Sequence, residues 1–187
     1  MTRIDSFSSW LSRWRVRMGL PAALIVLIFA HPSPMSLAIG LCICLFGLFL
    51  RAWASGHLKK NTSLATSGPY RFSRNPLYLA NLALGLGLVV AANSRACWFV
   101  FFLYFLAFYP ATIFNERKRM ARLFPKEYPE YEQKVPLFFP SLRRFFPYNH
   151  QKFNLALYFQ NKEYRAALAI FGFFLLLLFK WIFWIKP

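Results

Sequence analysis

Long stretches without a formal charge constrain this chain most. The first runs over residues 18–50, and two more, each 20 residues long, cover residues 75–94 and 96–115. A fourth, residues 166–185, is interrupted only by Lys180. A helix needs about 20 apolar residues to cross the hydrocarbon core of a bilayer. The pattern therefore predicts membrane-spanning helices.

The first stretch is too long for one span. Its 33 residues would form a helix of about 50 Å, whereas the hydrocarbon core is about 30 Å thick. His31-Pro32-Ser33-Pro34 lies near its middle, and proline breaks a helix because it lacks an N–H donor. Two short spans are expected here. We therefore expect an all-α fold: a polytopic membrane bundle of five transmembrane helices, with a cytosolic cap of short helices and loops.

Composition excludes other classes of protein. Hydrophobic residues make up 58 % of the chain, more than a soluble domain of this size can bury. The net charge of +17 could attract nucleic acid, but the basic residues flank apolar stretches, as in membrane proteins. No nucleic-acid partner is expected. The three cysteines lie in apolar stretches, and no two histidines have ligand spacing, so no metal site is expected.

The basic residues also predict an orientation. Of the 23 lysines and arginines, 20 lie before the first span or in the segments after spans two and four. Because basic residues concentrate on the cytoplasmic side, the N-terminus is expected there and the C-terminus outside. Lys180 would reach the outer interface with its long side chain. The expected location is a bacterial inner membrane.

Two cytosolic segments are expected to fold as a cap. Residues 56–74 contain the turn signal Ser67-Gly68-Pro69. Residues 116–165 contain five prolines, which exclude a single long helix. Glu116, at the end of the fourth span, is the only acid beside an apolar stretch. It serves either a bound ligand or a neighbouring arginine. Glu163 is expected to be exposed in polar surroundings.

The turn that opens the third span is crowded with functional side chains. Pro76 suits the first turn of a helix and Asn75 suits its cap. Gly68-Pro69-Tyr70, followed by Arg74-Asn75-Pro76-Leu77-Tyr78, resembles the G-x-Y-x-x-x-R-[HN]-P-x-Y signature of the isoprenylcysteine carboxyl methyltransferase family. Related phospholipid methyltransferases share this signature.

A second block supports the resemblance. Asn115-Glu116, the run Leu123-Phe124-Pro125-Lys126-Glu127-Tyr128-Pro129-Glu130-Tyr131, and then Val135 and Pro140 are similar to the family pattern E-E-x(n)-F-G-x-E-Y-x-x-Y-x-x-x-V-x-x-x-x-P. Arg51-Ala52-Trp53-Ala54 also matches. The resemblance covers about residues 40–140. It implies three parts: an N-terminal helical hairpin (1–55), a methyltransferase-like core (56–140), and a C-terminal extension with the fifth span (141–187).

The resemblance implies a cofactor, S-adenosyl-L-methionine, bound at the cytosolic face between the two blocks. The implied cofactor contacts are Thr62, Ser63, Leu64, Ala65, Tyr70, Asn75, Pro76, Leu77, Tyr78 and Glu116. The cofactor's sulfonium and ammonium suit a carboxylate and aromatic faces. Its own carboxylate suits Arg74 and the N–H groups of a helix start. No catalytic residue is assigned, and Arg74 is the one candidate.

Three positions depart from the family pattern. Asn75 replaces the common histidine, Asn115 replaces the first of two glutamates, and Thr112 stands where eukaryotic prenylcysteine enzymes have a substrate-binding arginine. Thr112 is the candidate for substrate binding. The substitution removes the expected partner of a prenylcysteine carboxylate.

The predicted function is that of an integral-membrane methyltransferase that uses S-adenosylmethionine. Its acceptor would be a membrane lipid or a lipidated or prenylated small molecule or protein, with O-methylation of a carboxyl group favoured. One alternative is a phospholipid N-methyltransferase. A second is a non-catalytic membrane protein whose basic cap binds anionic lipid or a protein partner. A reductase that uses a nicotinamide cofactor is a lesser alternative.

Overall fold

Helices are the only regular secondary structure in the described part of the chain, and loops connect them. The computed structural model describes residues 3–141, 147 and 151–185. The five long helices are α1 (Arg3–Phe29), α2 (Pro34–Ser55), α3 (Pro76–Ala92), α4 (Arg95–Leu123) and α7 (Tyr164–Lys180), which continues as η2 (Trp181–Ile185). The short helices are η1 (Gly68–Arg71), α5 (Tyr128–Lys134) and α6 (Leu155–Gln160). The predicted all-helical fold holds for these residues.

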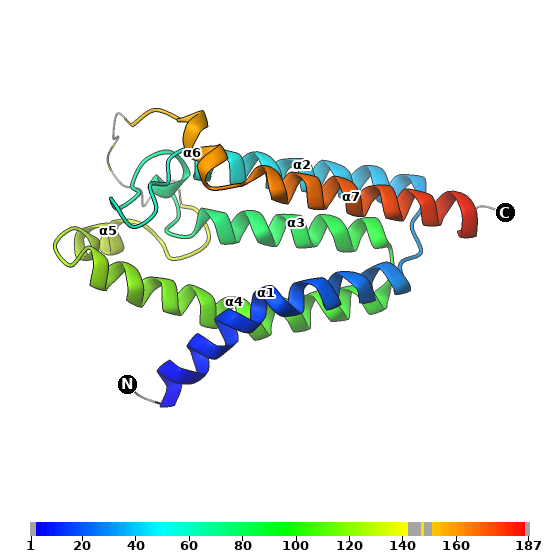
Figure 1. The fold of residues 1–187 in the computed structure, drawn as a ribbon, viewed down its shortest axis with the longest axis horizontal. Coiled ribbons are helices and arrows are strands. Elements are labelled where there is room, and N and C mark those ends of the chain that lie inside the picture. The colour runs from blue at the N-terminus through cyan, green and yellow to red at the C-terminus, as the bar shows by residue number, and fades with distance from the viewer. Residues whose placement is uncertain (1–2, 142–146, 148–150, 186–187) are drawn as a thin grey trace.

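The long helices lie lengthwise against one another, and the short ones gather at one end (Figure 1). We call that end, with the loops around α5 and α6, the cap end. The C-terminal end of η2 lies at the opposite end, which we call the closed end. The main helix pairs are α2 with α3 and α1 with α4. The beginning of α1 leaves the bundle on the side of the cap end.

Three helical segments of the described chain are long and apolar enough to cross a membrane. They are α2, α4 and Tyr164–Ile185. The apolar part of α1, Arg17–Phe29, and the 17-residue helix α3 are shorter. At 1.5 Å per residue, α3 reaches about 25 Å. The arrangement has the predicted helices, but five complete transmembrane spans and the three-part division of the chain stay predictions.

The closed end is tied by hydrogen bonds across two short turns. α1 ends at Phe29 and α2 begins at Pro34, which confirms the predicted break. The amide of His31 donates to Ala92 O (2.8 Å), and the Ser36 hydroxyl donates to Ala91 O (3.1 Å). These bonds satisfy backbone groups that would be costly to leave unpaired near a membrane.

Lys180 bonds to the C-terminal end of α1 at the closed end, and its place at the outer membrane interface stays a prediction. Its Nζ donates to the carbonyls of Leu27 (2.9 Å) and Ile28 (2.7 Å), in the last turn of α1. The final carbonyls of a helix lack internal partners and carry its negative dipole end, so they attract an ammonium group. Lys180 thereby joins the end of the chain to the first helix.

α2 and α3 pack closely through small residues. A Cβ on Gly40 would lie 2.5 Å from Gly87 O, and one on Gly87 would lie 2.5 Å from Cys44 Sγ. Neither position can hold a side chain without moving the helices apart. Close helix approach through small residues is typical of membrane proteins. The sequence contains no pair of glycines four residues apart, and this seam was not predicted.

Glu163 is buried, not exposed as predicted. Its side chain is 7 % exposed, and its Oε2 lies 2.6 Å from Arg51 Nη2. Arg51 also donates from Nη1 to Asn81 Oδ1. The prediction failed because it considered only the polar neighbours of Glu163 in sequence. Tertiary packing brings the start of α7 against α2, where a carboxylate is stable only with a charged partner.

Candidate functional site

A cavity of about 250 Å³ lies at the cap end. It is enclosed by the loop after α2, by η1 and the start of α3, by the last turns of α4, and by α5. The lining residues are Leu58, Lys59, Lys60, Asn61, Ser63, Leu64, Ala65, Tyr70, Arg74, Asn75, Pro76, Leu77, Tyr78, Glu116, Arg117, Arg119, Met120, Phe124, Tyr128 and Tyr131. The lining combines charged, aromatic and aliphatic side chains.

The structure brings nine of the ten predicted cofactor residues to this cavity. The exception is Thr62, which is exposed and whose hydroxyl donates to Lys59 O (3.3 Å). Arg74 lines the cavity as well. Thr112, the candidate for substrate binding, is outside the lining. It is 5 % exposed, and its hydroxyl donates to Phe108 O within α4.

The two sequence blocks are held together by a loop segment that we call the strap. The strap, residues 136–141, runs beside residues 72–75. The Arg74 amide donates to Pro136 O (3.0 Å), the Ser73 hydroxyl to Phe138 O (2.6 Å), and the Ser141 amide to Phe72 O (3.2 Å). The loop that begins α3 is thus fixed by chain from beyond α5.

Asn75 takes part in this strap and does not cap α3 through its side chain. Its Nδ2 donates to Leu137 O (2.8 Å), and its side chain makes no capping bond. Pro76 does occupy the first turn, as predicted. Asn75 is the N-cap residue of α3, as predicted, but its side chain bonds an acceptor 62 residues away, which local spacing cannot reveal.

Gly68 opens η1 in a conformation that favours glycine. Its φ is +55°, in the left-handed region, and a Cβ would lie 2.7 Å from His57 Nδ1. The His57 ring in turn bonds Trp53 O through Nδ1 (2.9 Å). Gly68 therefore allows the cofactor loop to pack against the end of α2.

Glu132 joins three parts of the cap. Its Oε1 accepts hydrogen bonds from Arg74 Nη1 (2.5 Å) and Arg117 Nε (2.6 Å). Burial tends to raise the pKa of Glu132, but the hydrogen bonds and charges of Arg117 and Arg74 outweigh it, so the pKa is lowered. Arg74 also donates to the Tyr128 hydroxyl (3.1 Å), while its Nε is buried without a partner in the structure.

Among the described residues that line the cavity, Glu116 is the only acid. Its side chain is 33 % exposed, and Oε2 lies 3.8 Å from Arg119 Nη1. Arg119 also donates to Asn61 Oδ1 (2.6 Å). The structure is therefore compatible with both predicted roles of Glu116, because it lines the cavity, where a ligand could bind, and it also contacts an arginine. An exposed pair of this length contributes little, so the carboxylate can bind a ligand cation.

Tyrosines form the aromatic part of the cavity. Tyr70 is 7 % exposed, and its carbonyl accepts the Tyr131 hydroxyl (2.8 Å). Burial, followed by the nearby phenol of Tyr131, raises the pKa of Tyr70. Tyr70 is therefore a neutral phenol at physiological pH. It can offer a ring face or donate a hydrogen bond, but it cannot act as a base.

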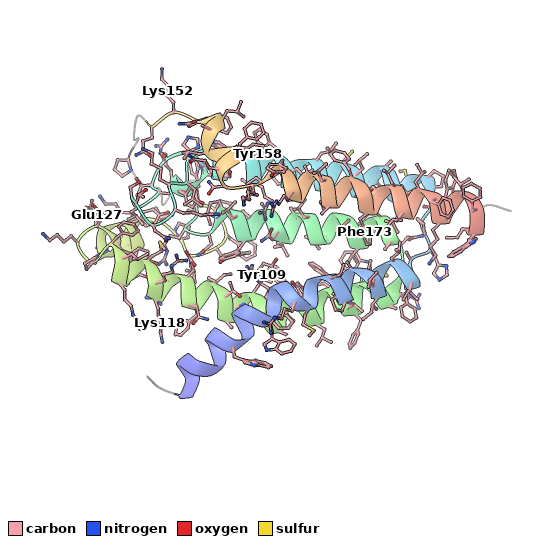
Figure 2. All side chains as sticks on the ribbon, viewed as in Figure 1. Tyr109, Lys118, Glu127, Lys152, Tyr158 and Phe173 are labelled. Atoms are coloured by element: carbon pink, nitrogen blue, oxygen red, sulfur yellow. The ribbon has the colours of Figure 1, made fainter. Side chains whose placement is uncertain are left out.

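Several lining residues were not predicted as site residues, including Lys59, Lys60 and Asn61. Tyr128 and Tyr131 also line the cavity, and their place in the second sequence block could have identified them as site residues. The side chains of Lys118, Glu127 and Lys152 project from the surface of the cap end (Figure 2), and none of them lines the cavity. No group of three or more metal-ligand side chains occurs in the described residues.

Comparison with known proteins identifies the family. The phospholipid methyltransferase family profile matches residues 35–127. The cobalt-zinc-cadmium resistance protein CzcN of Cupriavidus metallidurans is 35 % identical, over 73 % of this chain and 68 % of that protein. The nickel-cobalt-cadmium resistance protein NccN of Alcaligenes xylosoxydans is 32 % identical, over 76 % and 70 % respectively. No solved structure matches significantly.

The matched residues include α2, the loop with η1, α3 and α4, which enclose most of the cavity. The chain therefore belongs to the phospholipid methyltransferase family, within the isoprenylcysteine carboxyl methyltransferase-like group.

Proposed function

We propose that the protein is a membrane methyltransferase that binds S-adenosylmethionine in the cap-end cavity. The proposal rests on the observation that both sequence blocks contribute residues to one cavity. Residues of the first block, such as Tyr70 and Tyr78, and Glu116 of the second line one cavity, although some 40 positions separate them. The cofactor supplies a methyl group on a positively charged sulfur, from which a nucleophile can displace it.

The residues present fit this cofactor. Glu116 offers one carboxylate to its cationic groups, and the rings of Tyr70 and Tyr78 suit a cation or the adenine. Lys59 and Lys60 lie at the exposed rim and suit its carboxylate. Arg74 and Arg117 are already paired with Glu132, so they hold the cavity together.

We propose a lipid-like methyl acceptor that enters from the bilayer. An amine acceptor must lose a proton before it can attack, whereas a carboxylate is already ionised. Among the described lining residues there is no histidine to remove that proton. Carboxyl O-methylation is therefore favoured. The alternative is N-methylation of a phospholipid, which the family name describes and in which Glu116 would have to serve as the base.

We also propose that the cap end faces the cytosol and that the C-terminus lies outside. The charge distribution supports this orientation. A reporter that works only in the cytosol should be inactive when fused after Pro187. Activity at that position would contradict the orientation.

The relatives are named for metal resistance, and we propose a related physiological setting. The methylated product would contribute to tolerance of divalent metals through the membrane. Deletion of the gene should lower growth in cobalt, zinc or cadmium, and a variant that cannot bind cofactor should fail to restore it. Full restoration by that variant would separate metal tolerance from methyl transfer.

Binding of S-adenosylhomocysteine to detergent-solubilised protein tests the proposed function. Glu116→Gln should weaken binding roughly 10- to 150-fold, since a hydrogen bond to a charged group contributes about 1.5–3 kcal/mol. Calorimetry provides the measurement. The matched control is Glu130→Gln, because Glu130 is 62 % exposed and pairs with Lys134 outside the cavity lining.

Two results would contradict the proposal. One is the absence of binding by the wild-type protein at millimolar ligand. The other is equal affinity of folded Glu116→Gln and Glu130→Gln, which would return Glu116 to the role of a partner for Arg119.

A further inference from the structure

Arg15 of α1 lies against the membrane side of the cavity. Its Cζ is 5.3 Å from the ring centroid of Tyr78 and 5.5 Å from that of Tyr109. Tyr78 lines the cavity, whereas Tyr109 does not. Figure 2 shows Tyr109 in the space between α3 and the pair of α1 and α4. Tyr78 therefore separates Arg15 from the cavity, because it contacts both.

The charge of Arg15 is not balanced by an acid. Within the described part of the chain, Arg15 forms no ion pair, and its Nε is buried without a hydrogen-bond partner. The two tyrosine rings stabilise the cation only in part. Arg51, which also lies inside the bundle, is by contrast paired with Glu163 and Asn81.

Arg15 is held in place by the packing of α1 on α4. The Tyr104 hydroxyl donates to Arg15 O (2.8 Å). Tyr104 and Tyr109 lie on the same helix as Glu116. Since Tyr109 precedes Glu116 by seven residues, Arg15 contacts α4 about 10 Å further from the cap end than Glu116.

This position suits the acid group of an amphiphile. The apolar part of α1 begins at Arg17, so Arg15 lies where the polar and apolar parts of the helix meet. Arg15 has the Tyr109 hydroxyl as a hydrogen-bond partner but no acidic one. An arginine without an acidic partner at the edge of a membrane is expensive unless an anion joins it, and its guanidinium matches carboxylate and phosphate groups. The hydrocarbon chain of such a molecule would stay in the bilayer.

We infer that Arg15 binds the acid group, carboxylate or phosphate, of the methyl acceptor and so selects acidic over neutral lipids. The inference rests on the proposed function. Arg15 lies outside the residues 35–127 that match the family, so α1 supplies this selectivity to a core shared with other family members.

The test measures lipid binding to the full protein in maltoside micelles with S-adenosylhomocysteine present. Oleate is compared with oleyl alcohol, and dioleoyl phosphatidate with dioleoylglycerol, by thermophoresis. The wild-type protein should bind one of the acids at least roughly ten-fold more tightly than its neutral counterpart. The pair that shows the preference identifies carboxylate or phosphate as the group bound.

Arg15→Gln should remove this preference. The matched control is Arg17→Gln, because Arg17 is an exposed arginine on the same helix; this variant should keep the preference. Affinity for S-adenosylhomocysteine should be unchanged in Arg17→Gln. In Arg15→Gln it should change less than the lipid preference, because Arg15 packs on Tyr78 but does not itself line the cavity. This difference separates acceptor binding from the cofactor site. If the wild-type protein fails to bind S-adenosylhomocysteine, the proposed function fails, and the lipid preference is still measured by itself.

The inference is wrong if the wild-type protein shows no preference for either acid, or if Arg15→Gln keeps it. Should Arg15→Gln fail to fold, Arg15→Lys replaces it. Lysine keeps the charge but loses the two-pronged geometry, so the preference should fall without disappearing. An unchanged preference in Arg15→Lys would then contradict a specific role for the guanidinium.

Discussion

The interior of the bundle and the cap end are stabilised in different ways. Between α2 and α3, contacts are close, apolar and intolerant of added atoms, as at Gly40 and Gly87. At the cap end, polar groups such as Glu132 join segments that are distant in sequence, and they leave a cavity. The close seam between α2 and α3 therefore leaves little room for substitution, whereas the polar cap leaves room for a ligand.

Substitutions in the seam between α2 and α3 should destabilise the protein more than substitutions at the cap end. Gly87→Leu would place side-chain atoms against the backbone of α2, where even a Cβ would lie 2.7 Å from Gly40 O. Overpacking of a core commonly costs about 1–3 kcal/mol, and a clash with backbone exceeds this range. We expect most of the protein to be lost from the folded fraction on size-exclusion chromatography.

The control for this substitution is Gly172→Leu on α7, where an added Cβ would meet nothing within 4 Å. It should leave the folded fraction unchanged. If Gly87→Leu is tolerated as well as Gly172→Leu, the seam is less close than the structure indicates.

Loss of the buried ion pair between Arg51 and Glu163 should have the second-largest effect on stability. Glu163→Gln leaves Arg51 without its carboxylate in a largely buried position. Removal of one member of a buried pair costs about 3–5 kcal/mol, and the partial exposure of Arg51 favours the lower limit. Thermal unfolding in detergent should show a clear fall in stability. A variant as stable as the wild type would show that water or another group compensates Arg51.

Glu132 should have the smallest effect, because it is partly exposed. Glu132→Gln should cost about 1 kcal/mol at neutral pH, since it weakens hydrogen bonds of Arg74 and Arg117 on the cap surface. Cofactor affinity should fall with it, as Arg74 would be free to move.

The effect of Glu132 should also depend on pH. Its pKa is lowered in the folded protein, so its contribution is present above the unfolded pKa and is lost as the pH falls through the folded pKa. The stability difference between wild type and Glu132→Gln should therefore shrink below about pH 4. A difference that stays constant from neutral to acid pH would contradict a charge-based role.

Much of the site could be predicted because its residues are close together in the chain. The loop from Ser63 to Tyr78 carries most of the predicted cofactor residues, and Glu116 was identified as a lone acid at the end of an apolar stretch. The breaks near residues 31–34 and 93–95 follow from proline and from short polar turns. These predictions used local chemistry, which a sequence displays directly.

The apolar helices, the turns that separate them and the two blocks at the cavity follow from the order of residues along the chain. The partners of distant polar groups emerge only when the helices pack together: Glu163 for Arg51, the strap for Asn75, and the tyrosine rings for Arg15. The physical reason is that apolar character and helix breaking belong to single residues and their neighbours. Partners for buried polar groups, by contrast, depend on which helices pack together, and polar spacing along a chain does not encode this.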